Sequence, residues 1–198
     1  MKRLLKKTIL WILTAFLVLL AVACKGNEAR KVDELIRSIG TVTTESKAAI
    51  DSAESAYNEL SDEEKSRVTE YELLQKAINE YEECLLDALE ADSSLSQLKT
   101  VVSMAMNNYS PKFTLNREEK VLYMETTADK DSTDIILYYP GLSTAVFNAL
   151  KNNMCDISSQ IYEITQQYEV DSVIILKGAY DGITLLEIKN GEVTESVM

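Results

Sequence analysis

Residues 147–168, FNALKNNMCDISSQIYEITQQY, contain the strongest periodic pattern in the chain. Their apolar side chains recur at alternating spacings of three and four, at Phe147, Leu150, Met154, Ile157, Ile161, Ile164 and Tyr168. This spacing places all seven on one face of a helix. Such a stripe also fits the seam of a coiled coil, but it covers about three heptads and strand patterns flank it. We therefore predict a long amphipathic helix that lies on a β-sheet.

Three strand patterns follow this helix. Residues 172–177 and 183–189 are rich in β-branched and apolar side chains, and residues 180–182 form a turn between them. An Asn-Gly pair at 190–191 then leads to a third strand, which includes Val193. Asn-Gly between strand residues is the strongest short signal for a tight hairpin. The end of the chain is therefore predicted to form three strands joined by turns.

A helix and two strands are predicted before the long helix. An apolar stripe over residues 95–109 indicates the helix. Residues 112–115 and 120–127 form a predicted hairpin around the polar residues 116–119. The order helix, two strands, helix, three strands is typical of an α+β fold with an antiparallel sheet. We expect it to form one domain over residues 93–198.

The preceding region, residues 28–91, contains three amphipathic patterns joined by short turns. Ser61 and Glu64 have the spacing of a capping box, in which each side chain accepts a hydrogen bond from the other residue's backbone N–H. We expect this box to begin the third and longest helix. The apolar stripe of that helix consists of Val68, Tyr71, Leu74, Ile78, Tyr81, Leu85 and Leu89. Three such helices pack as an antiparallel bundle, and the predicted joint to the α+β domain is residues 91–94.

The first part of this bundle has a packing pattern that is similar to a known module. The pattern consists of Val32, Leu35, Ile36, Ile39, Gly40, Val42, Thr43, Ser46, Ile50, Ala53, Ala56, Tyr57, Leu60, Lys65, Val68 and Tyr71. It resembles the small helical modules of Gram-positive cell-surface proteins known as "found in various architectures" modules. The resemblance implies a surface location and a spacer or binding role. The chain has one copy rather than an array, which argues against a stalk.

The first 24 residues have the order of a bacterial lipoprotein leader. A basic start precedes an apolar run over residues 9–22, and a small residue and Cys24 close it. This order is typical of a signal peptide, and the run is shorter than the ~20 residues that cross a membrane. Residues 20–24, LAVAC, resemble a lipobox, whose cysteine is diacylated and becomes the mature N-terminus. We expect a cleaved leader at 1–23 and a lipidated Cys24 that begins a tether at 24–27. The alternative is an uncleaved N-terminal anchor.

Both alternatives place the remaining chain outside the cytoplasmic membrane, because the basic flank of the leader stays inside. The chain has 20 basic and 32 acidic residues, a net charge of −12. Loss of the four basic residues of the leader leaves 16 basic residues and a net charge of −16. Nucleic-acid binding needs a basic surface, so this charge excludes that class of partner. It also opposes contact with anionic lipid, so acyl chains must anchor the protein to the membrane.

The composition excludes most familiar catalytic and metal sites. The chain has no histidine, which excludes Ser-His-Asp and Cys-His catalysis and histidine zinc sites. Its six glycines provide neither a phosphate loop nor a dinucleotide-binding turn. Cys84 and Cys155 remain after the leader, and the sequence does not decide whether they pair. No catalytic, cofactor-binding or metal-binding residue is therefore predicted.

Residues 129–134, DKDSTD, have oxygen-bearing side chains at the alternate positions that calcium loops use. Asp134 stands where an EF-hand requires glycine, and Pro140 stands where its bidentate acid belongs. We expect a solvated, charged loop here rather than a cation site. Residues 135–139 are expected to form a short strand or an extended lead-in to the long helix.

Tyr138 and Tyr139 precede a Pro-Gly turn and form the one local feature that indicates recognition. Tyrosines held beside a rigid turn present large amphipathic rings at low entropic cost. If they end a strand, alternation turns one of them into the core. We predict a contact surface that includes this pair.

The favoured function is a surface-anchored lipoprotein that acts as a binding or scaffolding module in the cell envelope. Its partners would be the membrane, through the N-terminal lipid, and an envelope protein or cell-wall glycan. The alternative is a carboxylate-based envelope hydrolase, because a glycosidase needs only two suitably placed acids. The sequence does not identify the ligand or the oligomeric state.

Overall fold

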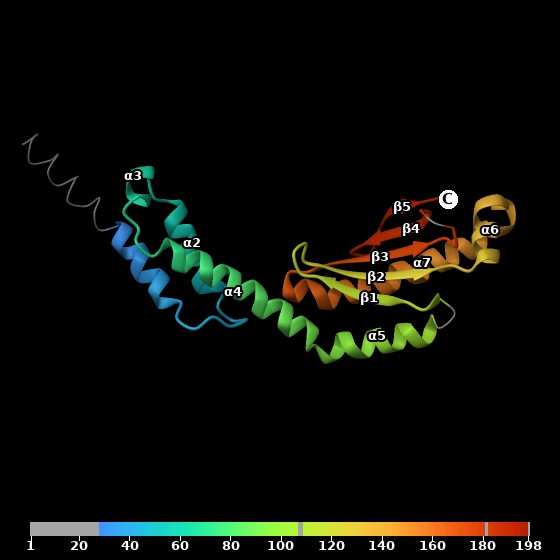
Figure 1. Cartoon of the computed structure of the whole chain (residues 1–198), viewed down its shortest axis with the longest axis horizontal. Helices are drawn as coiled ribbons and strands as arrows, with labels where there is room; N and C mark the ends of the chain where they lie inside the picture. The colour runs from blue at the N-terminus through green and yellow to red at the C-terminus, as the bar shows by residue number, and fades with distance from the viewer. Residues whose placement is uncertain (1–27, 107–108, 181, 198) are drawn as a thin grey trace, which may run out of the picture. The chain divides into compact units, whose positions relative to one another are not determined.

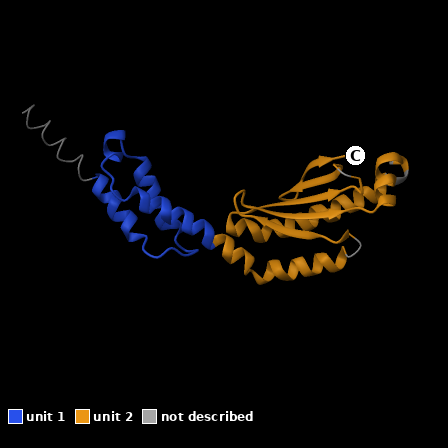
Figure 2. Ribbon diagram, in the orientation of Figure 1, with its two compact units in different colours: residues 1–84 blue, residues 85–198 orange. Residues whose placement is uncertain are grey.

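Helices occupy the first part of the described chain, and a five-stranded sheet with its helices occupies the rest (Figure 1). The computed structural model describes residues 28–106, 109–180 and 182–197. The chain divides into two compact units between Cys84 and Leu85 (Figure 2). The fold is α+β, as predicted from the order of the patterns.

The first unit is helical throughout its regular elements. Its core consists of Val32, Ile36, Ala53 and Leu74, with Leu35, Ile39, Ala56, Tyr57, Leu60, Val68 and Ile78 packed against it. Most of these side chains belong to the predicted apolar stripes, but Tyr71 of the third stripe is 39% exposed and lies outside the cluster. The elements are a helix over residues 28–38, α2 (Lys47–Asn58), α3 (Asp62–Lys65) and α4 (Tyr71–Glu90).

The capping box at Ser61 is present, but it begins only the four-residue helix α3. The prediction that it begins the long third helix is wrong, because α4 begins at Tyr71. A distant carboxylate marks this start. Asp33, 6% exposed, accepts hydrogen bonds of 2.9 Å from the backbone N–H groups of Thr69 and Glu70, and the Thr69 hydroxyl donates to it as well. No local sequence pattern indicates this contact, because Asp33 lies 36 residues before Thr69 and 37 residues before Glu70.

We expect Asp33→Ala to destabilise the start of α4. The substitution leaves two partly buried N–H groups without their acceptor, which costs about 1–3 kcal/mol each at most. The measurement is urea unfolding of the mature chain together with hydrogen exchange of the amides at 69–74. Glu34→Ala is the matched control, because Glu34 is its exposed neighbour and pairs with Arg30 on the surface. An equal decrease in the free energy of unfolding of the two variants would show that the Asp33 contacts contribute little to stability.

The second unit begins with the last turn of α4. Leu86 and Leu89 are buried in its core, and Arg117 donates to Asp87 and Glu90 at 2.8 Å. Its further elements are α5 (Ser93–Ala105), β1 (Lys112–Asn116), β2 (Val121–Thr127), α6 (Lys130–Tyr138), α7 (Pro140–Thr165), the 3-10 turn η2 (Gln166–Tyr168), β3 (Asp171–Lys177), β4 (Thr184–Lys189) and β5 (Glu192–Ser196).

The segment predicted as the joint, residues 91–94, is a tight connection between α4 and α5. Asp92 accepts hydrogen bonds from the backbone N–H groups of Ser94 and Leu95, and so caps α5. The hydroxyl of Tyr168 also donates to it at 2.6 Å. The Tyr168 bond and these backbone bonds hold the pKa of Asp92 below its usual range. The division between the units lies upstream, within α4.

The sheet has the strand order β1-β2-β3-β4-β5. Both predicted hairpins are present, and three of the four neighbouring pairs are antiparallel, in agreement with the predicted antiparallel sheet. The β2/β3 pair is parallel, which the strand patterns do not predict. The reason is the connection: α6 and α7 cross from the end of β2 back to its other end, so β3 starts beside the start of β2.

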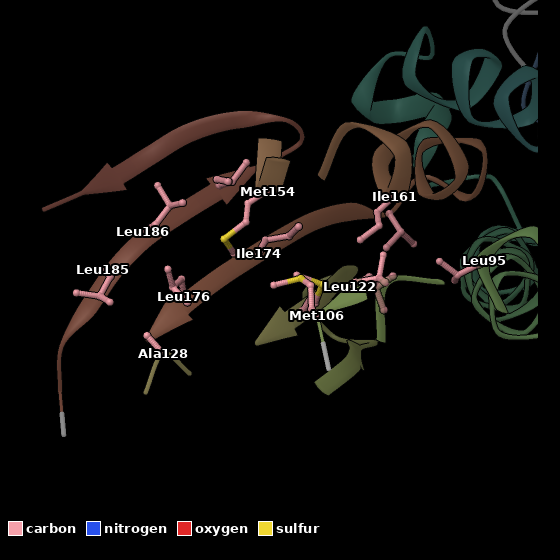
Figure 3. Close-up of a cluster of buried hydrophobic side chains, with 14 of the residues drawn as sticks. Leu95, Met106, Leu122, Ala128, Met154, Ile161, Ile174, Leu176, Leu185 and Leu186 are labelled. Carbon is pink, nitrogen blue, oxygen red and sulfur yellow. The ribbon is translucent and has the colours of Figure 1, made fainter. Parts of the chain in front are cut away.

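Helix α7 lies on the sheet, as its stripe predicts. Phe147, Met154 and Ile161 are at most 1% exposed and belong to one cluster with the inward side chains of the strands. Figure 3 shows Met154 and Ile161 in this cluster. A bulge in the β3/β4 pair lets Leu185 and Leu186 both enter this core, since each is fully buried. The alternative of a coiled-coil seam is excluded by this packing.

The Asn190-Gly191 turn closes the β4/β5 hairpin as predicted. Both residues have positive φ, 52° and 88°, which is the requirement of a two-residue type I′ turn. The backbone N–H of Gly191 donates to the hydroxyl of Ser158 on α7 at 3.0 Å. A Cβ atom at Gly191 would clash with the Ser159 hydroxyl oxygen unless that side chain rotated, so glycine also permits a close helix–turn contact.

We expect Gly191→Ala to lower the free energy of unfolding by at least about 1–2 kcal/mol, the cost of a left-handed conformation for a residue with a Cβ. The measurement is denaturant unfolding of the mature chain. Gly141→Ala is the matched control, because a Cβ atom at Gly141 would have no atom within 4 Å and the φ of Gly141 is not positive. Similar stability of both variants would contradict the proposed role of the turn.

Candidate functional site

The segment around the predicted tyrosine surface is helical. Residues Lys130–Tyr138 form α6, so the predicted loop at 129–134 and strand or lead-in at 135–139 are wrong. The cause is a cap: the Asp129 carboxylate accepts a hydrogen bond of 2.7 Å from the backbone N–H of Ser132. This bond lowers the pKa of Asp129, and the Ser132 hydroxyl contributes a second bond. An Asp-x-x-Ser cap is visible in the sequence, but the dense charges indicate a solvated loop instead.

Polar contacts fix α6 against the loop between β3 and β4. Thr133 is fully buried, donates to the Asp129 carbonyl and accepts from the backbone N–H of Ala179 at 2.9 Å. The Tyr180 hydroxyl donates to the Asp134 carboxylate, and this bond raises the pKa of Tyr180 to about 12. The helix that ends in the tyrosine pair is therefore firmly held by its neighbours.

Both predicted surface tyrosines are exposed. Tyr138 ends α6 and Tyr139 connects it to α7, with exposed fractions of 66% and 57%. Alternation along a strand does not apply, because the pair ends a helix. Ile135 and Val146, on either side of the pair in sequence, are also exposed at 45% and 71%. Four exposed aromatic or apolar side chains therefore lie within residues 135–146.

This surface adjoins a groove, which we call the α5–α7 groove. A cavity of about 440 Å³ is lined by Ala105, Met106, Tyr109, Leu150, Asn153, Met154, Asp156 and Ile157. A smaller cavity of about 90 Å³ is lined by Tyr109, Ser132, Ile135, Ile136, Val146, Phe147 and Leu150. The two cavities share Tyr109 and Leu150 and therefore adjoin each other, and Ile135 of the smaller one lies one helical turn before Tyr138 on α6.

The described lining of the α5–α7 groove is mostly apolar, and Asp156 is its one charged residue. Helix α7 carries two further charged residues, Lys151 and Glu163. Glu163 is exposed two helical turns beyond Asp156 and so projects from the same side of α7. Lys151 lies on the opposite flank, one turn before Cys155, whose pKa is raised mainly by burial and is influenced by both Asp156 and Lys151. The groove therefore has an apolar floor and an acidic margin.

The other residues singled out by the sequence do not join this surface. Cys84 and Cys155 are half-buried free thiols. Within residues 28–106, 109–180 and 182–197, no group of three or more acidic or cysteine side chains is placed to hold a metal ion. No helix in that part of the chain is long and apolar enough to cross a membrane. The lipidation site predicted at Cys24 lies outside the described residues, as do the leader and tether.

Sequence reasoning identifies the tyrosine pair but misses the groove. Leu150 and Ile157 belong to the apolar stripe of α7, and the stripe predicts core positions for both. They are only partly buried because α5 and α7 leave the groove between them. The distance between two helices is not encoded in the spacing of either one. Comparison of the chain with family models, curated proteins and solved structures finds no significant match.

Proposed function

We propose that this chain is an extracytoplasmic lipoprotein, anchored to a bacterial cell membrane by lipid at Cys24, which binds another component of the envelope. The LAVAC stretch at residues 20–24 and the basic, apolar leader before it support the anchor. The net charge of −16 after loss of the leader supports a protein that the lipid tethers and the membrane surface repels. The partner in this proposal is an envelope protein or a cell-wall glycan.

The exposed Tyr138-Tyr139 pair beside the α5–α7 groove is the observation that carries the binding role. Large exposed apolar groups grouped around a concave surface are typical of interaction sites rather than of ordinary protein surface. Tyrosine is enriched at such sites because its ring is apolar and its hydroxyl remains hydrated. The hydrogen bonds of Thr133 and Tyr180 fix the α6 backbone that carries Tyr138, which reduces the backbone entropy lost on binding.

The alternative function, a carboxylate-based hydrolase, requires two acids in one cleft. Among the described cavities, carboxylates contribute to the lining only at Asp156, in the α5–α7 groove. No observation on the described residues therefore favours the hydrolase, and we propose the binding function alone.

The experiment is photo-crosslinking of the anchored protein in intact cells, with the crosslinker at Val146 beside the tyrosine pair, followed by identification of the captured partner. We expect the double variant Tyr138→Ala/Tyr139→Ala to lose most of the crosslink while its unfolding curve stays unchanged. Loss of aromatic anchors costs roughly 2 kcal/mol, about thirtyfold in affinity. Val193→Ala is the control, because Val193 is an exposed apolar residue on β5. Normal capture by the double variant would overturn the tyrosine surface.

A further inference from the structure

The α5–α7 groove provides evidence about the chemistry of its partner. The inference about this partner rests on the proposed binding function. It concerns the class of molecule that the described side chains can accommodate. Three properties decide it: the shape of the groove, the polarity of its floor and the sign of the charge at its margin.

The shape of the groove suits the apolar face of a helix. It lies between two helices, so it presents side chains and no unpaired strand edge to which an extended peptide could add. Its volume of about 440 Å³ is sufficient for several apolar side chains. Amphipathic helices bind such grooves through side chains at positions i, i+3, i+4 and i+7.

The polarity of the floor opposes a glycan. A sugar ring needs several directed hydrogen bonds in addition to an apolar contact, whereas Met106, Leu150, Met154 and Ile157 make up half of the residues that line the larger cavity. Asn153 and Asp156 lie among the polar side chains of its lining, on the exposed side of α7. The floor therefore matches an apolar stripe of another protein.

The charges on the α7 side of the groove favour a basic partner. Asp156 and Glu163 project from the same side of α7, and Lys151 lies on its opposite flank. Residues 85–198 carry 17 acidic and 8 basic side chains, so the field around the groove is negative. A second copy of this acidic chain would be repelled, and so would an anionic membrane surface. Lysine or arginine on the polar face of a helix would meet these carboxylates favourably.

We infer that the α5–α7 groove binds a basic amphipathic helix of a partner protein, with its apolar stripe on Leu150 and Ile157 and its cations beside Asp156 and Glu163. In this arrangement the tyrosine pair contacts one end of the bound helix. The complex would join the anchored protein to another protein rather than to the cell-wall glycan.

The test uses the mature chain and a labelled 18-residue peptide of leucine and lysine with helical amphipathic spacing. Binding is measured by fluorescence anisotropy in about 150 mM salt, which screens non-specific attraction. A scrambled peptide of the same composition is the first control. We expect the amphipathic peptide to bind at least about tenfold more tightly than the scrambled one, because only the former presents an apolar stripe.

Two charge reversals then locate the site. Asp156→Lys should weaken binding of the amphipathic peptide about five- to tenfold, since an attraction becomes a repulsion. Glu192→Lys makes the same change in net charge at an exposed position of β5 and should change affinity less than about twofold. Both variants replace exposed side chains, and their unfolding curves are compared with that of the unaltered chain to establish that they fold.

Equal binding of both peptides, or equal weakening by both reversals, would overturn the inference, because either result indicates non-specific attraction. Absence of peptide binding would overturn it as well. If the crosslinking experiment in cells still captured a partner in that case, the proposed binding function would stand and only the class of partner would be wrong. Binding of soluble cell-wall glycan in competition with the amphipathic peptide would equally exclude a helix as the natural occupant.

Discussion

Ile161→Asp is expected to unfold the second unit. Ile161 is 1% exposed and lies in the cluster where α7 meets the sheet (Figure 3). Loss of a large buried aliphatic side chain costs about 2–5 kcal/mol, and a carboxylate without a partner adds its own desolvation cost. A domain of ordinary stability has about 5–15 kcal/mol, so the sum removes most or all of it. The readout is loss of protected amides on β3 and β4 in hydrogen exchange.

Two further variants on α7 serve as comparisons for the loss of stability in Ile161→Asp. Gln160→Asp places the same carboxylate at an exposed neighbour and should leave the unfolding curve nearly unchanged. Ile157→Asp should have an intermediate effect, because Ile157 is half-buried and lines the α5–α7 groove. A native exchange pattern in Ile161→Asp would show that α7 presents a different face to the sheet.

Cys24→Ala is expected to abolish acylation completely and to leave the leader attached. The reason is chemical: the diacylglyceryl group needs the thiol of Cys24, and lipoprotein processing follows its attachment. The measurement is metabolic labelling with a fatty acid in the native host, combined with the apparent mass of the chain. The loss of lipid label is expected to be complete. Without two acyl chains, only the uncleaved leader would anchor the acidic chain to the bilayer.

Cys84→Ala and Cys155→Ala are the matched controls, since both remove a thiol from the described part of the chain and neither thiol is bonded to another. Both variants should keep the lipid label and should have the lower apparent mass of the processed chain. An unaltered chain without label, at the mass of the full precursor, would favour the uncleaved anchor and would remove the lipid from the proposed function.

Local patterns predict the elements whose causes are local. The α7 stripe and the Asn190-Gly191 turn depend on residues within a few helical turns or one hairpin, and both are present as predicted. The start of α4 depends on Asp33, which is far away in the chain, so the local pattern places this start too early. The parallel β2/β3 pair depends on how a long connection crosses the sheet. The residues near either strand do not indicate the direction of this crossing.

The candidate site likewise has one part that the local sequence predicts and another part that it does not. Tyr138 and Tyr139 can be identified because two tyrosines before Pro-Gly are visible in any window of sequence. Their helical setting is not evident, because the cap at Asp129 resembles part of a charged loop. The groove beside them depends on where α5 lies relative to α7, and such a position follows from the packing of the whole unit.

The parallel β2/β3 pair also has a kinetic consequence. It pairs Val121 with Asp171, 50 positions later in the chain, so the two strands meet only when the whole segment that contains α6 and α7 is closed into a loop. Closing so long a loop costs entropy before any strand contact compensates for it, and folding slows as contacts become less local. The first unit, whose contacts are mainly between helices, is expected to fold within milliseconds or less. The sheet should form later and more slowly, with β2 and β3 gaining their second neighbours together when they pair. Until then the facing edges of both strands are open to pairing with other chains, which is an aggregation risk of the unfolded chain.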